Sequence, residues 1–331
     1  MKRFLALLLT LLMVLSLCAC STKEPVEEPD PTKEPGNVNI EILMEEDDSM
    51  KNTYTVIAVN PDADFVDADG NAVSDVELNT IGADALINWL LSEEGLKLAS
   101  EYGTENYGTN LFTIMDGCPT SDAEIPQATE ETMNIRLSTT TSVNDSGLLG
   151  ALLPVFEEEY GYKVEVFSAG TGKAIANAQM GNADLILVHA KAKETDFVDA
   201  GFARIVEGQE AERLSYMYNF FVLCGPSDDP AGVKDAADVM AAFKAIADGG
   251  FKFVSRGDGS GTHTKELALW PAELGITEEQ ESFADYTEWY VSSNAGMGVC
   301  LTMANEQGAY ILSDKATFLT FQLNDGVMPE A

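Results

Sequence analysis

The order of apolar and polar positions predicts alternating strands and helices over most of the chain. From residue 134 onward, short apolar runs such as ADLILVH and NFFVLCG alternate with longer stretches such as SGLLGALLPVFEEEYG. The short runs have the length and composition of buried strands, and the longer stretches repeat apolar residues at the helical period. Such alternation predicts an α/β fold in which parallel strands are flanked by helices.

The region before residue 134 contains fewer elements. YTVIAVN, at residues 54–60, predicts a strand, and residues 81–102 have the helical apolar period and end at Gly103. One or two strands and one or two helices are too few to bury a core alone, so we expect this region to pack onto the rest of the chain. Residues 116–133 are polar, contain two prolines and are predicted to be a linker.

The first 19 residues predict a secretory signal peptide, because two basic residues precede an apolar run and small residues. The apolar run is shorter than the ~20 residues that a membrane-spanning helix needs. LCAC resembles the lipobox of bacterial lipoproteins, which implies a lipid on Cys20 and anchoring to the bilayer outside the cytoplasm. Residues 20–37 are rich in Pro and Glu and are predicted to be a disordered tether. A plain signal peptide with an incidental cysteine is the alternative.

The charge and the cysteine content limit the classes of partner and cross-link that this chain can have. The 331 residues include 19 basic and 55 acidic ones, for a formal net charge of −36. So acidic a surface argues against binding nucleic acid. An anion site on this chain must attract its ligand through nearby groups. This is possible because salt screens the repulsion from acidic residues more than ~8 Å away. Cys118, Cys224 and Cys300 are too few and too widely spaced for a disulfide framework, although one bridge stays open.

The loop SRGDGSGTH, at residues 255–263, has the chemistry of an anion site. Three glycines let successive N–H groups turn toward one point, and the helix that follows adds its partial positive charge. Arg256 supplies a full charge, and Thr262 supplies a hydroxyl. Asp258 is predicted to orient the arginine or to cap the helix. The alternative is an ordinary turn with a surface ion pair.

Two more loops between a strand and a helix repeat this chemistry. STTTS places Thr140, Thr141 and Ser142 at a predicted helix start, which is more hydroxyls than capping needs. SAGTGKA adds Thr171, but it lacks the spacing of a nucleotide-binding P-loop. Loops at the carboxyl ends of strands in two α/β units predict a ligand cleft between two lobes.

Catalysis and metal binding have weak support in the sequence. His189 and His263 are the only histidines, and no Cys or His cluster has ligand spacing for a transition metal. A hydrolase that uses His263 is an alternative, but no G-x-S-x-G motif is present. We therefore expect a binding protein without catalytic residues or cofactors.

These motifs resemble the tungstate-binding proteins of ABC importers, which belong to the type II periplasmic-binding-protein superfamily. The resemblance covers most of residues 38–103 and 134–320. It implies two lobes, each a sheet flanked by helices, that close over an oxyanion held by Thr140, Thr141, Ser142, Thr171, Arg256 and Thr262. It also implies a monomer that docks on an ABC permease with its ATPase. Molybdate, phosphate or sulfate is the alternative ligand, and an anchored oxyanion sensor is the alternative role.

In that family the TTTS motif lies near the mature start and the YTVIAVNP strand lies near the end, so this chain resembles a circular permutation. The resemblance implies that residues 38–115 complete lobe one and that residues 116–133 link the usual ends. It also implies that residues 134–218 form lobe one, that residues 219–313 form lobe two and that residues 314–331 return to lobe one. A separate appended domain is the alternative.

The orientation of Asp258 bears on the ligand. Tungstate and molybdate are fully deprotonated near neutral pH and only accept hydrogen bonds. Phosphate keeps a proton and gains from a carboxylate acceptor. A carboxylate of Asp258 that faces the ligand would favour phosphate, and one that faces the backbone would favour tungstate or molybdate.

Overall fold

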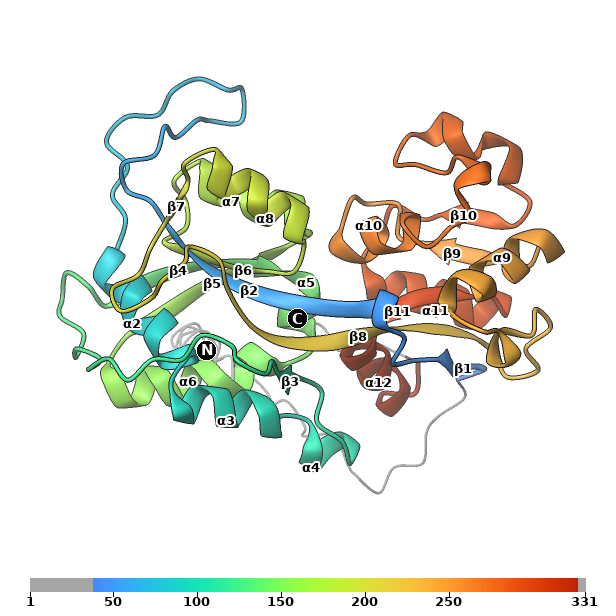
Figure 1. The fold of residues 1–331 in the computed structure, drawn as a ribbon, viewed down its shortest axis with the longest axis horizontal. Helices are drawn as coiled ribbons and strands as arrows, with labels where there is room; N and C mark the ends of the chain where they lie inside the picture. Colours follow the sequence, from blue (N-terminus) through green and yellow to red (C-terminus); the bar gives the residue numbers. More distant parts are fainter. Residues whose placement is uncertain (1–37, 327–331) are drawn as a thin grey trace, which may run out of the picture. The chain divides into compact units, whose positions relative to one another are not determined.

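The longest strand of the structure belongs to both lobes (Figure 1). In this computed structural model, which describes residues 38–326, β8 (Leu214–Pro226) crosses a sheet with the order β1-β8-β2-β6-β4-β5. The bounds of its partners are β1 (Ile40–Met44), β2 (Lys51–Val59), β6 (Leu185–Val188), β4 (Asn134–Thr140) and β5 (Lys163–Ala169). β3 (Thr113–Ile114) and β11 (Ile311–Asp314) also pair with β8, and β7 (Ala203–Arg204) pairs with β2.

Lobe one is built on β2, β6, β4 and β5. β4 is parallel to β5 and β6, and β2 lies antiparallel between β6 and β8. Residues 54–59 of β2 are all buried because helices cover both faces of the sheet. Tyr54, Val56 and Ala58 face a core with α2 (Thr80–Leu90), α3 (Glu93–Glu101) and α6 (Leu148–Tyr160). Ile57 and Val59 face α7 (Thr171–Gln179) and α8 (Lys191–Asp199).

Lobe two contains the far half of β8, β1, β11 and a parallel pair, β9 (Phe253–Ser255) and β10 (Tyr290–Ser292). Its helices are α9 (Val239–Gly249), α10 (Gly261–Leu267) and α11 (Met297–Gln307). Two apolar clusters fill the lobe, one under α9 and one under α11. The α/β fold with two lobes, each a sheet flanked by helices, confirms the expected fold class.

Three boundaries differ from the sequence expectation. The lobe boundary at residue 218 falls inside β8, which pairs with β2 up to Phe220 and with β11 from Phe221 onward. β1, which we expected in lobe one, pairs with residues 223–226 and places Ile40 in a lobe-two core. α12 (Lys315–Leu323) contacts both lobes, with Phe318 in the lobe-two cluster and Ala316 in the lobe-one core.

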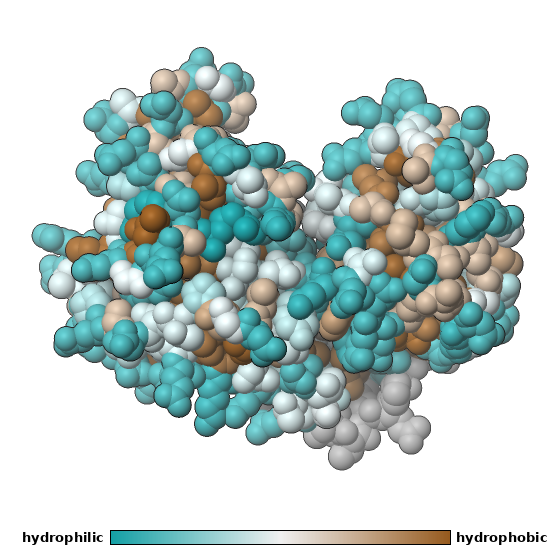
Figure 2. Space-filling view, in the orientation of Figure 1, coloured by the Kyte–Doolittle hydropathy of each residue, from teal (hydrophilic) through white to brown (hydrophobic). Residues whose placement is uncertain are grey.

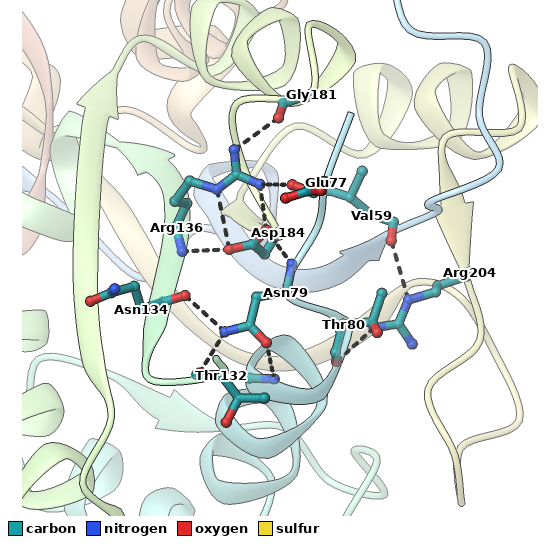
Figure 3. Close-up of polar contacts among 11 residues, drawn as sticks. Val59, Glu77, Asn79, Thr80, Thr132, Asn134, Arg136, Gly181, Asp184 and Arg204 are labelled. Atoms are coloured by element: carbon teal, nitrogen blue, oxygen red, sulfur yellow. Dashed lines mark hydrogen bonds and ion pairs between the residues drawn. The ribbon is translucent and has the colours of Figure 1, made fainter. Parts of the chain in front are cut away.

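The start of α2 is tied into lobe one by polar contacts (Figure 3). The side chain of Asn79, which caps α2, donates to the carbonyls of Thr132 and Asn134 at 2.6 and 2.8 Å. Its backbone N–H donates to Asp184 at 2.9 Å, and Asp184 pairs with Arg136 at 2.6 Å. These contacts join residues 38–115, the linker 116–133 and β4 in one network.

The two ends of the described chain lie together. A Cβ built on Gly326 would lie 3.5 Å from Cγ2 of Val38. The amide of Asn39 donates to the side chain of Asn305 at 2.6 Å. The predicted signal peptide, the tether and Cys20 lie outside the described residues. No helix among residues 38–326 is long and apolar enough to cross a membrane, and Cys118, Cys224 and Cys300 are free thiols.

Candidate anion-binding site

The threonine-rich turn forms the first wall of the site. β4 ends at Thr140 and leads directly into a short helix, α5 (Thr141–Asp145). Ser138 and Thr139 point inward, and their hydroxyls donate to backbone carbonyls at 2.8 and 2.7 Å. The hydroxyls of Thr140 and Ser142 lie 3.1 Å apart, and Thr140 has no capping bond to the helix. Hydroxyl groups beyond structural need therefore remain at this helix start.

His189 contacts this wall, a role that the sequence analysis did not assign to it. Its Nε2 lies 2.9 Å from the hydroxyl of Ser142. The ring packs against Tyr54 and Phe221, and burial, together with the charge of Arg256, lowers the pKa of His189 to about 3. The imidazole is therefore neutral near pH 7. Its Nδ1 is buried and has no hydrogen-bond partner among the described residues.

The junction between β5 and α7 contributes two buried hydroxyls without partners in the described part of the chain. Thr171 is fully buried as the first residue of α7, and its Oγ1 makes no hydrogen bond within residues 38–326. The buried Oγ of Ser168, at the end of β5, is in the same condition. A buried hydroxyl without a partner is costly and calls for an explanation, of which a bound ligand is one.

The arginine loop forms the wall in lobe two. The side chain of Arg256 is 5% exposed, and its Nη2 donates to Oδ2 of Asp258 at 2.5 Å. The other oxygen of Asp258 accepts from the amide of Ser260 at 3.1 Å. The Nε of Arg256 is buried and has no partner in the described part of the chain. Asp258 thus faces the arginine and the loop backbone, which is the second of the two orientations considered.

The other residues of this loop hold the start of α10. The hydroxyl of Ser260 accepts from the amide of His263 at 3.3 Å, and Nδ1 of His263 accepts from the amide of Gly259 at 3.0 Å. Both side chains are therefore engaged in capping the helix and closing the loop. This arrangement gives no support to a hydrolase that uses His263. Thr262, 3% exposed, lies between them in sequence.

Contacts across the lobes bring these walls together. A Cβ built on Gly170 would lie 3.7 Å from Ser260, and one built on Gly261 would lie 2.4 Å from the imidazole of His189. Nζ of Lys193 donates to the carbonyl of Gly259 at 3.2 Å. We call this contact zone between residues 170–193 of lobe one and residues 256–262 of lobe two the seam. Of the residues predicted to bind the anion, Thr171, Arg256 and Thr262 lie within the seam. Ser142, which follows Thr140 and Thr141 in sequence, reaches the seam through its contact with His189.

The electrostatics suit a small anion better than a cation. Burial raises the pKa of Asp145, and a hydrogen bond from Asn144 and the charge of Arg256 oppose that rise. Asp145 is thus a second carboxyl within reach of this arginine's field, which sequence order alone did not indicate. No group of His, Cys, Asp and Glu within residues 38–326 is arranged to hold a metal ion. Hydroxyl and guanidinium donors without acceptors can bind a group that only accepts hydrogen bonds.

Residues 125–330, more than half of the chain, match the PBP (periplasmic binding protein) superfamily domain. The chain is 45% identical over 224 residues to a tungstate-binding protein of Peptoclostridium acidaminophilum. The aligned region covers 66% of this chain and 72% of that protein. It is 42% identical over 231 residues to a putative ABC transporter anion-binding protein of Haloferax volcanii. That aligned region covers 66% of this chain and 63% of the relative.

A solved structure is also similar. The tungstate ABC transporter structure from Geobacter sulfurreducens is 40% identical in sequence, and the match covers 60% of this chain and 80% of that one. The TM-score of the superposition is 0.48.

Proposed function

The chain belongs to the PBP superfamily, and we propose that it is an extracytoplasmic solute-binding protein that captures tungstate and delivers it to an ABC permease and its ATPase. The observation that supports this most is a pair of buried donors without acceptors. One is the hydroxyl of Thr171 in lobe one, and the other is Nε of Arg256 in lobe two. A ligand that accepts from both would hold the lobes together. A binding protein of this kind is not an enzyme and needs no cofactor.

The ligand chemistry follows from Asp258. Both of its oxygens accept bonds from its own loop, so its carboxylate is turned toward the loop and not toward a ligand. An oxyanion without protons fits such a site, because every contact is then a donor meeting an acceptor. We propose that the contacts come from Thr140, Thr141, Ser142, Thr171, Arg256 and Thr262. Tungstate and molybdate share the required charge and shape, and the relatives favour tungstate.

Asp145 supports phosphate as a second candidate. Its carboxyl is partly buried on α5, and the charge of Arg256 influences its pKa. A carboxylate there would accept a hydrogen bond from the one oxygen of phosphate that stays protonated near pH 7. Replacement of Asp145 by Asn would remove this acceptor while leaving Arg256 and the hydroxyls in place.

Calorimetric titration of the mature protein with tungstate, molybdate, sulfate and phosphate tests the proposal. We expect one site per chain that binds tungstate and molybdate more tightly than the other two anions. Phosphate as the tightest ligand, with its affinity lost in Asp145→Asn, would instead establish the second candidate. Absence of binding by all four anions would contradict an oxyanion site.

We propose a lipid anchor at Cys20, followed by a tether over residues 20–37. The sequence motif LCAC supports the anchor. A Cys20→Ser variant expressed in a bacterial host should leave the membrane fraction while keeping its oxyanion affinity. Equal membrane retention of the variant would argue against lipidation at this residue.

We also infer a circular permutation in which residues 38–115 complete the fold that begins at residue 134. Three observations support it. Val38 lies beside Gly326, as is required if residues 326 and 38 were joined in the unpermuted order. Asn79 and Asp184 bind residues 38–115 to the linker and to β4 (Figure 3). The superfamily match begins at residue 125, inside the linker, and thus excludes β2 and α2.

A further inference from the structure

A cluster of lysines lines a hollow beside the seam. The cavity has a volume of about 590 Å³ and lies between α8 and α10, with β2 and β8 at its base. In the space-filling view the surface is notched between the two lobes there (Figure 2). We call this cavity the basic hollow, because its lining includes five cationic residues: Lys51, Lys191, Lys193, Arg213 and Lys265. Glu194 is its single carboxylate, and it pairs with Arg213.

The four lysines of the basic hollow have no carboxylate partner within residues 38–326. Lys51 lies over the ring of Tyr218, Lys193 and Lys265 donate to backbone carbonyls, and Lys191 is exposed. The described chain contains 15 Lys and Arg residues, of which seven lack an ion pair, and four of these seven line this one cavity. In a chain with 55 acidic residues, this is a local concentration of uncompensated positive charge.

The basic hollow adjoins the seam through contacts that lobe separation would break. His189 and Gly261 line the hollow, and His189 also contacts Ser142 of the proposed site. Lys193 stands at the same boundary, where its ammonium donates to Gly259 and lies 3.5 Å from a Cβ built on Gly172. The partition between hollow and site is therefore made of side chains and loops from opposite lobes. Parting of the lobes would open the hollow into the site.

We propose that the basic hollow is a vestibule, a weak second anion site that collects hydrated oxyanions before they pass into the seam. This inference rests on the proposed function of the seam. A volume of 590 Å³ holds roughly 20 water molecules at about 30 Å³ each, so an oxyanion there keeps much of its hydration. Clefts lined by one sign of charge raise association rates by ~10- to 1,000-fold. The vestibule thus offsets, within a Debye length, the repulsion that a chain of charge −36 exerts on a dianion.

The test removes two vestibule charges whose ammonium groups bond neither to the opposite lobe nor to a carboxylate. Lys51→Gln/Lys191→Gln changes two exposed lysines of the hollow. Lys163→Gln/Lys252→Gln is the matched control, because it removes two exposed, unpaired lysines elsewhere. Stopped-flow tryptophan fluorescence with tungstate would give the association and dissociation rates at low and high salt. Calorimetric Kd values would report the same change without an optical signal.

We expect the vestibule variant to bind tungstate about five- to tenfold more slowly at low salt, with an unchanged dissociation rate. At high salt the difference should shrink, and the control should match the wild type. Equal association rates for the vestibule variant and the wild type would overturn the vestibule, as would an equal loss in the control. Wild-type protein that fails to bind tungstate would instead overturn the proposed function, and with it this inference.

Discussion

Thr171 and Arg256 each carry a buried donor for which the described chain supplies no acceptor. Such groups destabilise the free protein, because their lost hydration is not replaced. Because these groups have already lost their water in the free protein, ligand binding requires no further free energy to desolvate them. The residues that weaken the free protein are thus the ones we expect to strengthen the complex.

Thr171→Val should weaken tungstate binding by about tenfold, since it removes one hydrogen bond to a charged ligand, worth about 1.5 kcal/mol. The stability of the free protein should stay constant or rise slightly. Thr317→Val is the control, because its hydroxyl is also buried without a partner but lies on α12. Calorimetry and thermal melting check both variants. A large loss of stability without a loss of affinity in Thr171→Val would show that the hydroxyl has a structural role.

Gly261→Ala should weaken tungstate binding at least about tenfold. The added Cβ would lie 2.4 Å from Cε1 of His189, so the lobes could not meet as they do here. Gly150→Ala, in an exposed turn of α6 with no atom near the added Cβ, is the control. Titration should show a loss for Gly261→Ala alone. An unchanged Kd would mean that closure does not bring these residues together in the complex.

At the scale of elements, α10 is joined to β10 by a buried carboxyl. Glu266 accepts from Trp270 at 2.9 Å and from Tyr290 at 2.8 Å, and burial raises its pKa to about 7. Between pH 4.5 and pH 7 the unfolded chain loses this proton while the folded chain keeps it. The stability that the neutral form provides is therefore present at pH 4.5 and is lost by about pH 7.

Glu266→Gln should remove this pH dependence, because an amide keeps the two accepted bonds and does not titrate. The free energy of unfolding of the wild type relative to the variant should fall by up to about 3 kcal/mol between pH 5 and pH 8. Urea unfolding of both proteins at the two pH values measures the difference. Parallel pH profiles would show that Glu266 titrates normally.

The sequence predicted those elements whose burial is local in origin. ADLILVH and YTVIAVN are buried on both faces of the sheet, and their mostly apolar composition predicted that both are strands. The contact between His189 and Ser142 was not predictable, because it depends on β6 lying beside β4 in the strand order. The full length of β8 was also missed, since its first residues, LSYMY, are only partly apolar.

In the candidate site too, features within one loop were predictable from the sequence, and contacts between distant residues were not. Glycines, hydroxyls and an arginine within one loop indicated anion chemistry, and the orientation of Asp258 was one of two stated options. Asp145 and Lys193 became relevant only through the meeting of the two lobes. Contacts between residues far apart in sequence leave no periodic pattern for a single sequence to show.

At the scale of the whole molecule, the proposed permutation can be reversed. A chain that starts at residue 134, joins residue 326 to residue 38 through a short linker and ends at residue 115 should fold and bind tungstate like the wild type. The reason is that Val38 lies beside Gly326, where an added Cβ would be 3.5 Å from the Val38 side chain, so a short linker can span the gap. Circular dichroism and titration check the rearranged chain. Failure to fold would indicate that the linker 116–133 is itself required.

The sharing of β8 by both lobes has a consequence for unfolding. Its first half pairs with β2, and its second half pairs with β1 and β11. If one lobe melted, the other would lose the continuation of its central strand and the contacts of α12. The free-energy cost of that loss couples the two halves, so heating should give a single calorimetric transition despite the bilobal build.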